Sequence, residues 1–195
     1  MRSPLILDWG CGLRKHDGAI GTDNVAIGSV DLVHDLKSFP YPFKSECADE
    51  VILSHVLEHL SLQEINRVLG EAWRILKPDG VAMISVPHAL STGFYADPTH
   101  VSHFTFETFY YFTQSHHFSY YKDIDSQWRI KRLWASVNIR SNLHKEDNGW
   151  QMRLNGFGSQ VLSYIVRRSR TVPDLMVKIL PVWLVSIHCR LAKTQ

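Results

Sequence analysis

Two short apolar runs with a helix-forming segment between them constrain the fold most. Residues 51–53 (VIL) and 81–86 (VAMISV) are continuous and apolar, which is typical of strands buried on both faces of a parallel sheet. Between them, residues 61–77 place apolar side chains at helical spacing and begin with a capping box, Ser61 followed three residues later by Glu64. A Pro-Asp-Gly segment then ends the helix. A strand, a helix and a strand with short links predict a parallel sheet of the α/β class.

The rest of the chain offers further elements of the same kinds. The alternation along residues 183–192 has a period of two, which predicts a strand with unlike faces. Apolar or β-branched runs predict other strands at residues 5–7, 19–23, 30–36 and 127–139. Helices are expected at residues 105–113, at 159–170 and from Pro173, with a polar loop at 140–156. At roughly 150 residues per domain, 195 residues predict a single domain, 1–195.

Composition excludes several classes of protein. Lys plus Arg number 21 and Asp plus Glu 19, and this balance gives no electrostatic case for nucleic-acid binding. The cysteines Cys11, Cys47 and Cys189 are odd in number and widely spaced, so neither a disulfide framework nor a zinc cluster follows from them. The chain has no apolar stretch of about 18 residues, which predicts no membrane span. The N-terminal apolar run is too short for a signal peptide, so a cytoplasmic protein is expected.

A glycine-containing segment directly follows the first predicted strand. Gly10 and Gly12 allow the backbone to turn sharply and to approach a ligand closely. Asp23 ends the second predicted strand, where a carboxylate can accept hydrogen bonds from ribose hydroxyls. These residues form a candidate nucleoside site at the carboxyl edge of the sheet. A plain tight turn remains the alternative, since a lone Gly-x-Gly is weak evidence.

Five segments, in order along residues 5–88, carry a resemblance to a known family. They are residues 7–12 (LDWGCG), 21–23 (GTD), 35–36 (DL), 49–60 (DEVILSHVLEHL) and 71–81 (EAWRILKPDGV). Together they resemble the class I S-adenosylmethionine-dependent methyltransferases, in the small-molecule branch similar to methyltransferase type 11. The resemblance implies a Rossmann-like sheet of seven strands, mostly parallel, with an antiparallel last strand at residues 183–192.

The same resemblance implies S-adenosylmethionine as cofactor. Residues 1–88 would be the cofactor-binding half, and residues 89–195 the substrate-side half with insertions and the final strands. The residues at matching positions, which we expect to bind the cofactor, are Asp8, Gly10, Cys11, Gly12, Asp23, Asn24, Asp35, Leu36, Ser54 and His55. The chain departs from the usual pattern at residues 13–18, which are too few for the full helix that normally precedes the ribose-binding acid.

The later segments 86–88 (VPH), 97–100 (DPTH) and 104–106 (FTF) resemble small methyltransferases associated with bacterial surface polysaccharide synthesis. That resemblance implies O-methylation of a sugar or glycan precursor.

A hydroxyl acceptor benefits from a base near the carboxyl ends of the strands at 51–53 and 81–86. His55 is one candidate, and His100 with Asp97 as its orienting partner is another. The alternatives are that His55 contacts the cofactor or caps its strand, and that residues 97–100 form only a turn. His59 lies four residues after His55, with Glu58 between them, and is expected to have a structural hydrogen-bonding role.

The remaining histidines, the aromatic residues and a basic cluster give weaker evidence of function. His100 and His103 are three residues apart, but no recognisable ligand set accompanies them, so no metal is predicted. In the aromatic-rich segment 94–112, Phe106 and Phe109 are expected in the core, whereas Tyr95 could face substrate. A basic cluster is most simply a solvated face, with weak contact to an anionic surface as the alternative; it comprises Arg167, Arg168, Arg170 and Lys178.

Two other functions stay open. A nucleotide-dependent oxidoreductase shares the glycine loop and acid, but Lys15 stands where the dinucleotide fingerprint has its third glycine. A non-catalytic, cofactor-binding partner subunit is the second alternative, since methyl transfer requires no particular catalytic residue. The sequence leaves the oligomeric state open.

Overall fold

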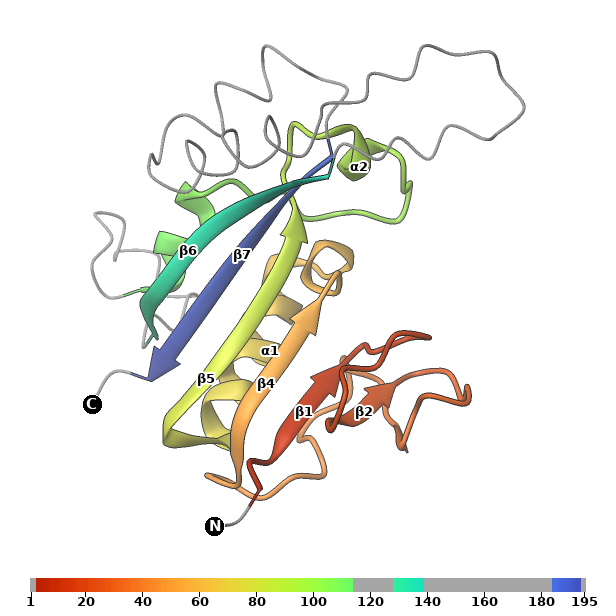
Figure 1. The fold of residues 1–195 in the computed structure, drawn as a ribbon, viewed down its shortest axis with the longest axis vertical. Coiled ribbons are helices and arrows are strands. Elements are labelled where there is room, and N and C mark those ends of the chain that lie inside the picture. The colour runs from red at the N-terminus through yellow and green to blue at the C-terminus, as the bar shows by residue number, and fades with distance from the viewer. Residues whose placement is uncertain (1–2, 114–127, 139–183, 194–195) are drawn as a thin grey trace.

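The computed structural model describes residues 3–113, 128–138 and 184–193 (Figure 1). The strands are β1 (Ile6–Trp9), β2 (Ile20–Asp23), β3 (Leu32–Val33), β4 (Ala48–Ser54), β5 (Leu76–Pro87), β6 (Trp128–Asn138) and β7 (Leu184–Lys193). The helices are α1 (Leu62–Ile75) and α2 (Thr92–Tyr95), with 3₁₀ turns η1 (Leu57–His59) and η2 (Glu107–Phe112). The predicted loop at 140–156, the predicted helices beyond it and the basic cluster lie outside the described residues.

The seven strands form one sheet in the order β3-β2-β1-β4-β5-β7-β6. The pairs from β3 to β5 are parallel, whereas β7 runs antiparallel to both β5 and β6 (Figure 1). This confirms the predicted fold class, including the antiparallel last strand. The order reverses between β1 and β4, and ligands of open α/β sheets bind at the carboxyl ends of the strands beside such a reversal.

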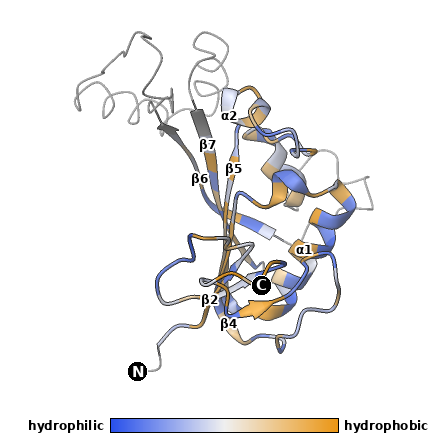
Figure 2. Ribbon diagram, turned by 90° about the vertical axis from the view of Figure 1, so that its right-hand side faces the viewer, coloured by the Kyte–Doolittle hydropathy of each residue, from blue (hydrophilic) through white to orange (hydrophobic). Residues whose placement is uncertain are grey.

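Helix α1 covers one face of the sheet (Figure 2). The predicted capping box is confirmed: the Ser61 side chain accepts from the Glu64 amide, and the Glu64 carboxylate accepts from the Ser61 amide. The buried face of the helix carries Ile65, Val68, Leu69, Ala72 and Ile75. Each large aliphatic side chain buried in this way contributes about 1.5–3 kcal/mol to folding.

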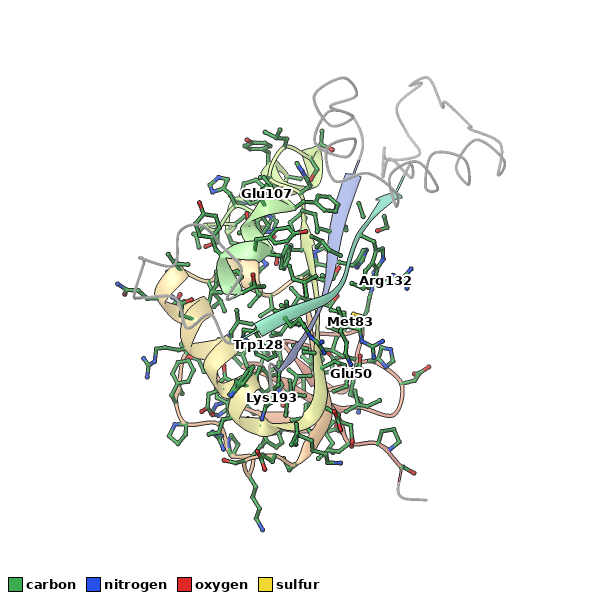
Figure 3. The ribbon with its side chains drawn as sticks, turned by 90° about the vertical axis from the view of Figure 1, so that its left-hand side faces the viewer. Glu50, Met83, Glu107, Trp128, Arg132 and Lys193 are labelled. Atoms are coloured by element: carbon green, nitrogen blue, oxygen red, sulfur yellow. The ribbon has the colours of Figure 1, made fainter. Side chains whose placement is uncertain are left out.

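The two faces of the sheet differ in character. Trp128 of β6 lies on the α1 side, where its ring meets that of Trp73 edge-on at 5.1 Å between centroids (Figure 3). Glu50, Met83 and Arg132 lie on the opposite side (Figure 3). The main core of the described residues therefore sits between the sheet and α1.

Three elements differ in extent from the sequence predictions. Strand β3 has two residues: after it, Asp35 accepts the Lys37 amide and forms a turn, and before it, Asp31 accepts the Gly21 amide of β2. Strand β5 begins directly at the end of α1, with a register shift opposite Ala48 and Glu50 that accommodates the Pro-Asp-Gly segment. The predicted helix at 105–113 is the 3₁₀ turn η2, in which Phe109 is buried as expected.

Among the described residues, no helix is both long and apolar enough to cross a membrane.

Candidate active site

The loop after β1 is shaped by two glycines with positive φ, Gly10 at +69° and Gly12 at +51°. The amides of Gly10 and Cys11 both donate to the Thr22 carbonyl, at 2.7 and 3.2 Å, which draws the loop across the end of β2. A Cβ atom at Gly10 would lie 2.5 Å from Cγ2 of Val56. Only glycine therefore fits between β1 and the residues that follow β4.

The segment from Leu13 to Gly18 contains turns and no helix, as its length predicts. The buried Asp8 carboxylate accepts the His16 amide at 2.7 Å and so fastens this segment to β1. Burial raises the pKa of the Asp8 carboxyl, whereas the His16 bond lowers it. Lys15 pairs with Asp31 at 2.7 Å on the other side of the segment. Side-chain bonds thus hold this connection in place of a helix.

Asp23 ends β2 beside the glycine loop. Its Oδ2 accepts the Gly12 amide at 2.9 Å, and its Oδ1 accepts the Val25 amide at 3.3 Å. A carboxylate has about four lone-pair sites, so each oxygen can still accept a further hydrogen bond. Asp23 can therefore both shape the loop and bind a ligand hydroxyl.

A pocket of about 340 Å³ opens at the carboxyl ends of β1, β2 and β4. Of the predicted cofactor-binding residues, it is lined by Gly10, Asp23, Asn24, Asp35, Leu36 and His55. The other four, Asp8, Cys11, Gly12 and Ser54, are not among the lining residues. Asp8 is buried in β1 and Cys11 in the loop after it, while Gly12 donates its amide to Asp23.

Four lining residues were not predicted as binding residues: Lys37, Val56, His59 and Leu60. Lys37 follows Asp35 by two residues and pairs with Glu64 at 3.0 Å, so its position depends on α1. The other three belong to the turn after β4, where only His59 was expected to have a structural role. Their signal in the sequence was their place directly after the strand, at the same edge as Asp23.

His55 stands at the end of β4 with a φ of +56°, unusual for a residue other than glycine. Its amide donates to the Ser85 carbonyl of β5 at 2.8 Å. Its Nδ1 lies 3.0 Å from Oε1 of Glu58, which is fully buried, while the His55 side chain is 52% exposed. Because a carboxylate only accepts, Nδ1 carries the hydrogen and Nε2 keeps its lone pair.

The predicted partners His100 and Asp97 are not among the residues that line the pocket. His100 Nδ1 lies 2.8 Å from the Phe94 carbonyl, and its ring lies 4.7 Å from that of His59. Asp97 Oδ1 accepts both the amide and the hydroxyl of Thr99, and these bonds lower the pKa of the Asp97 carboxyl. Its Oδ2 lies 3.8 Å from His100 Nε2, beyond hydrogen-bonding distance. Residues 97–100 form a turn, and the catalytic role of His100 and Asp97 stays a prediction.

Residues 18–84 match the protein family described as Methyltransferase domain. The chain has no match among curated proteins. These matched residues run from β2 through β5 and include most of the pocket.

Several solved structures share the fold. A structure described as a SAM-dependent methyltransferase from Archaeoglobus fulgidus is 20% identical, with a TM-score of 0.55, covering 95% of this chain and 86% of that one. A second structure described as a SAM-dependent methyltransferase, from Methanosarcina mazei, is 13% identical with a TM-score of 0.57. The match covers 99% of this chain and 93% of that one. YcgJ of Bacillus subtilis is 15% identical, with a TM-score of 0.53 and coverage of 98% and 92%.

The sheet therefore has the fold of structures described as SAM-dependent methyltransferases, and residues 18–84 within it match a methyltransferase domain.

Proposed function

We propose that the chain transfers the methyl group of S-adenosylmethionine to a hydroxyl of a small acceptor, with His55 accepting the hydroxyl proton. The observation that carries this proposal is the pocket itself, where Gly10, Asp23 and His55 meet at the reversal of the strand order. The matched domain and the shared fold support the choice of cofactor.

The residues present fit this cofactor. The pocket has a volume of about 340 Å³, which lies within the range of small-molecule sites, about 300–1,000 Å³. Gly10 lets the cofactor approach the backbone, Asp23 can accept from ribose hydroxyls, and Asp35 with Leu36 can meet the adenine. When bound, the cofactor supplies an electrophilic methyl group. The chain then has mainly to hold donor and acceptor in line, a contribution of about 7–11 kcal/mol.

His55 is placed to take the acceptor's proton. Glu58 fixes Nδ1 as the protonated nitrogen and restrains the ring, so Nε2 is the basic atom. A base positioned in this way contributes about 10²–10⁴-fold to rate. We propose Glu58 as the positioning residue in place of Asp97, because Asp97 is bonded to Thr99 and His100 does not line the pocket.

A sugar or glycan precursor is the acceptor we propose. The exposed ring of Tyr95, 68% accessible, lies just beyond the carboxyl end of β5 and offers a flat surface for a sugar. The resemblance of residues 86–106 to methyltransferases of polysaccharide synthesis supports the same class. The hydroxyl would have to approach His55 from the open side of the pocket.

Formation of S-adenosylhomocysteine with a panel of nucleotide sugars and short saccharides tests this function. We expect turnover with at least one of them, and a loss of about 10²–10⁴-fold in kcat for His55→Asn. Asparagine is chosen because it tolerates a positive φ. S-adenosylmethionine binding should persist in that variant, and replacement of the exposed His103 by alanine should change neither quantity. Equal turnover by wild type and His55→Asn would contradict the role of His55.

A further inference from the structure

A second cluster of polar side chains lies beside the pocket and shares only Glu58 with the function proposed above. We propose that Glu58, His59 and His100 bind one divalent transition-metal ion, with zinc as the natural candidate. One potential ligand atom from each residue lies within 4.8 Å of those of the other two. This proposal does not depend on the identity of the methyl acceptor.

The backbone builds the cluster from two distant segments. The amides of Val101 and Ser102 both donate to the Glu58 carbonyl, at 2.8 and 3.0 Å. The Ser102 hydroxyl also donates to the Leu60 carbonyl. These bonds fasten the loop after α2 onto η1 and bring the His100 ring to 4.7 Å from that of His59.

In both His59 and His100, a hydrogen bond at Nδ1 leaves Nε2 as the nitrogen that can bind a metal ion. His100 Nδ1 lies 2.8 Å from the Phe94 carbonyl, which can only accept, so Nδ1 carries the hydrogen. The Thr99 hydroxyl donates to Asp97 at 2.6 Å and therefore accepts from His59 Nδ1 at 2.9 Å. Both rings thus keep a lone pair on Nε2. This is the arrangement of metal-binding histidines, whose other nitrogen donates to a backbone carbonyl or a polar group.

The Glu58 carboxylate gives independent support for a bound cation, because one of its buried oxygens has no hydrogen-bond partner in the described part of the chain. Its side chain is fully buried, and Oε1 is bonded to His55. Among the described residues, Oε2 is one of the few buried polar side-chain atoms with no hydrogen-bond partner. A buried carboxylate oxygen without a partner is costly, and a cation bound by the two imidazoles would satisfy it.

Two imidazoles and one carboxylate suit zinc or another first-row divalent ion. Tetrahedral bonds of about 2.0–2.2 Å place two ligand atoms about 3.3–3.6 Å apart, so the ligand atoms, which lie within 4.8 Å of one another, would draw closer together on binding the ion. Three protein ligands leave a coordination position for water or a substrate oxygen. His59 also lines the pocket, so the bound ion would border the proposed methyl-transfer site.

No metal is predicted from the sequence, because no recognisable ligand set accompanies His100 and His103. The structure pairs His100 with His59, 41 positions earlier in the chain, and adds the buried Glu58. Only the fold brings these residues together, so their spacing carries no motif.

Tag-free protein, stripped with a chelator and titrated calorimetrically with Zn²⁺, tests the site, and Co²⁺ absorbance reports its coordination. We expect one equivalent to bind to wild type. Affinity should fall at least about 100-fold in His59→Ala and in His100→Ala, and about tenfold in Thr99→Val, which loses the bond that orients His59. His103→Ala is the matched control, and its affinity should equal that of wild type.

Absence of stoichiometric binding by wild type would overturn the site, as would equal losses in His59→Ala and His103→Ala. Thermal unfolding of each metal-free variant separates a folding defect from a lost ligand. S-adenosylmethionine binding is measured on the same samples. Metal binding without cofactor binding would support this site and contradict the proposed function. Cofactor binding without metal binding would support the proposed cofactor and contradict this site.

Discussion

Two residues at the pocket adopt backbone conformations that set its shape. His55 keeps a positive φ although it carries a side chain, a conformation that costs of order 1–3 kcal/mol and is retained mainly at functional positions. Gly10 has a positive φ and also no room for a Cβ. The backbone at these two residues helps to bring the imidazole and the glycine loop to the same pocket, which Val56 also lines.

Replacing Gly10 by alanine tests this close approach. The new methyl group would meet Val56 at 2.5 Å, so we expect a destabilisation of about 1–3 kcal/mol beyond the strain of the positive φ, and weaker cofactor binding. Gly12→Ala is the control, since Gly12 also has a positive φ but nothing within 4 Å of its Cβ position. Urea unfolding compares the two variants. Equal losses of stability would show that the contact with Val56 is unimportant.

At the scale of elements, an ion pair within α1 supports hydrogen bonds from the helix to the chain before β4. Arg74 contacts Glu71 through two nitrogens, at 2.8 and 2.7 Å, and also donates to the Phe43 and Tyr41 carbonyls. Glu71 accepts the Tyr41 amide at 2.7 Å. The hydrogen bond from the Arg74 guanidinium lowers the pKa of the Glu71 carboxyl, and the Tyr41 amide lowers it to a smaller extent.

This lowered pKa gives stability a pH dependence of known sign. The contribution of Glu71 is complete above the ordinary glutamate pKa, about 4.3, and is lost as the pH falls through its lower folded-state value. We expect Glu71→Gln to lower the free energy of unfolding at pH 7 by about 1–3 kcal/mol. The difference from wild type should shrink between about pH 5 and pH 3. Urea unfolding across this range measures it, with the exposed Glu107→Gln as control; a constant difference would contradict the assignment.

Local patterns predicted some elements well and others only partly. Helix α1 was predictable to within two residues because its cap and its apolar face are both local in the sequence. The two-residue length of β3 was not, because it depends on where the Asp31 and Asp35 carboxylates bond. The contact of buried Glu58 with His55 was missed for a similar reason: its burial arises from packing, which its neighbours in the chain do not indicate.

At the scale of the whole molecule, the strand order creates the site. Strands β1 and β4 are neighbours in the sheet although β2 and β3 lie between them in the chain. Their parallel ends therefore place Gly10 and His55 at one edge, with Asp23 beside them from β2. This juxtaposition was predictable from the sequence, because the motif order implied the sheet. The chain holds it with a short turn between β1 and β2 in place of a helix.

Calorimetric titration with S-adenosylmethionine, and separately with NAD, tests the central claim most directly. We expect saturable binding of S-adenosylmethionine alone, and its loss in Asp23→Ala. The exposed Asp79→Ala should bind as wild type does. Thermal unfolding of Asp23→Ala checks that the variant is folded, because Asp23 also holds the Gly12 amide. Binding of NAD alone, or S-adenosylmethionine binding that survives intact in Asp23→Ala, would contradict the account.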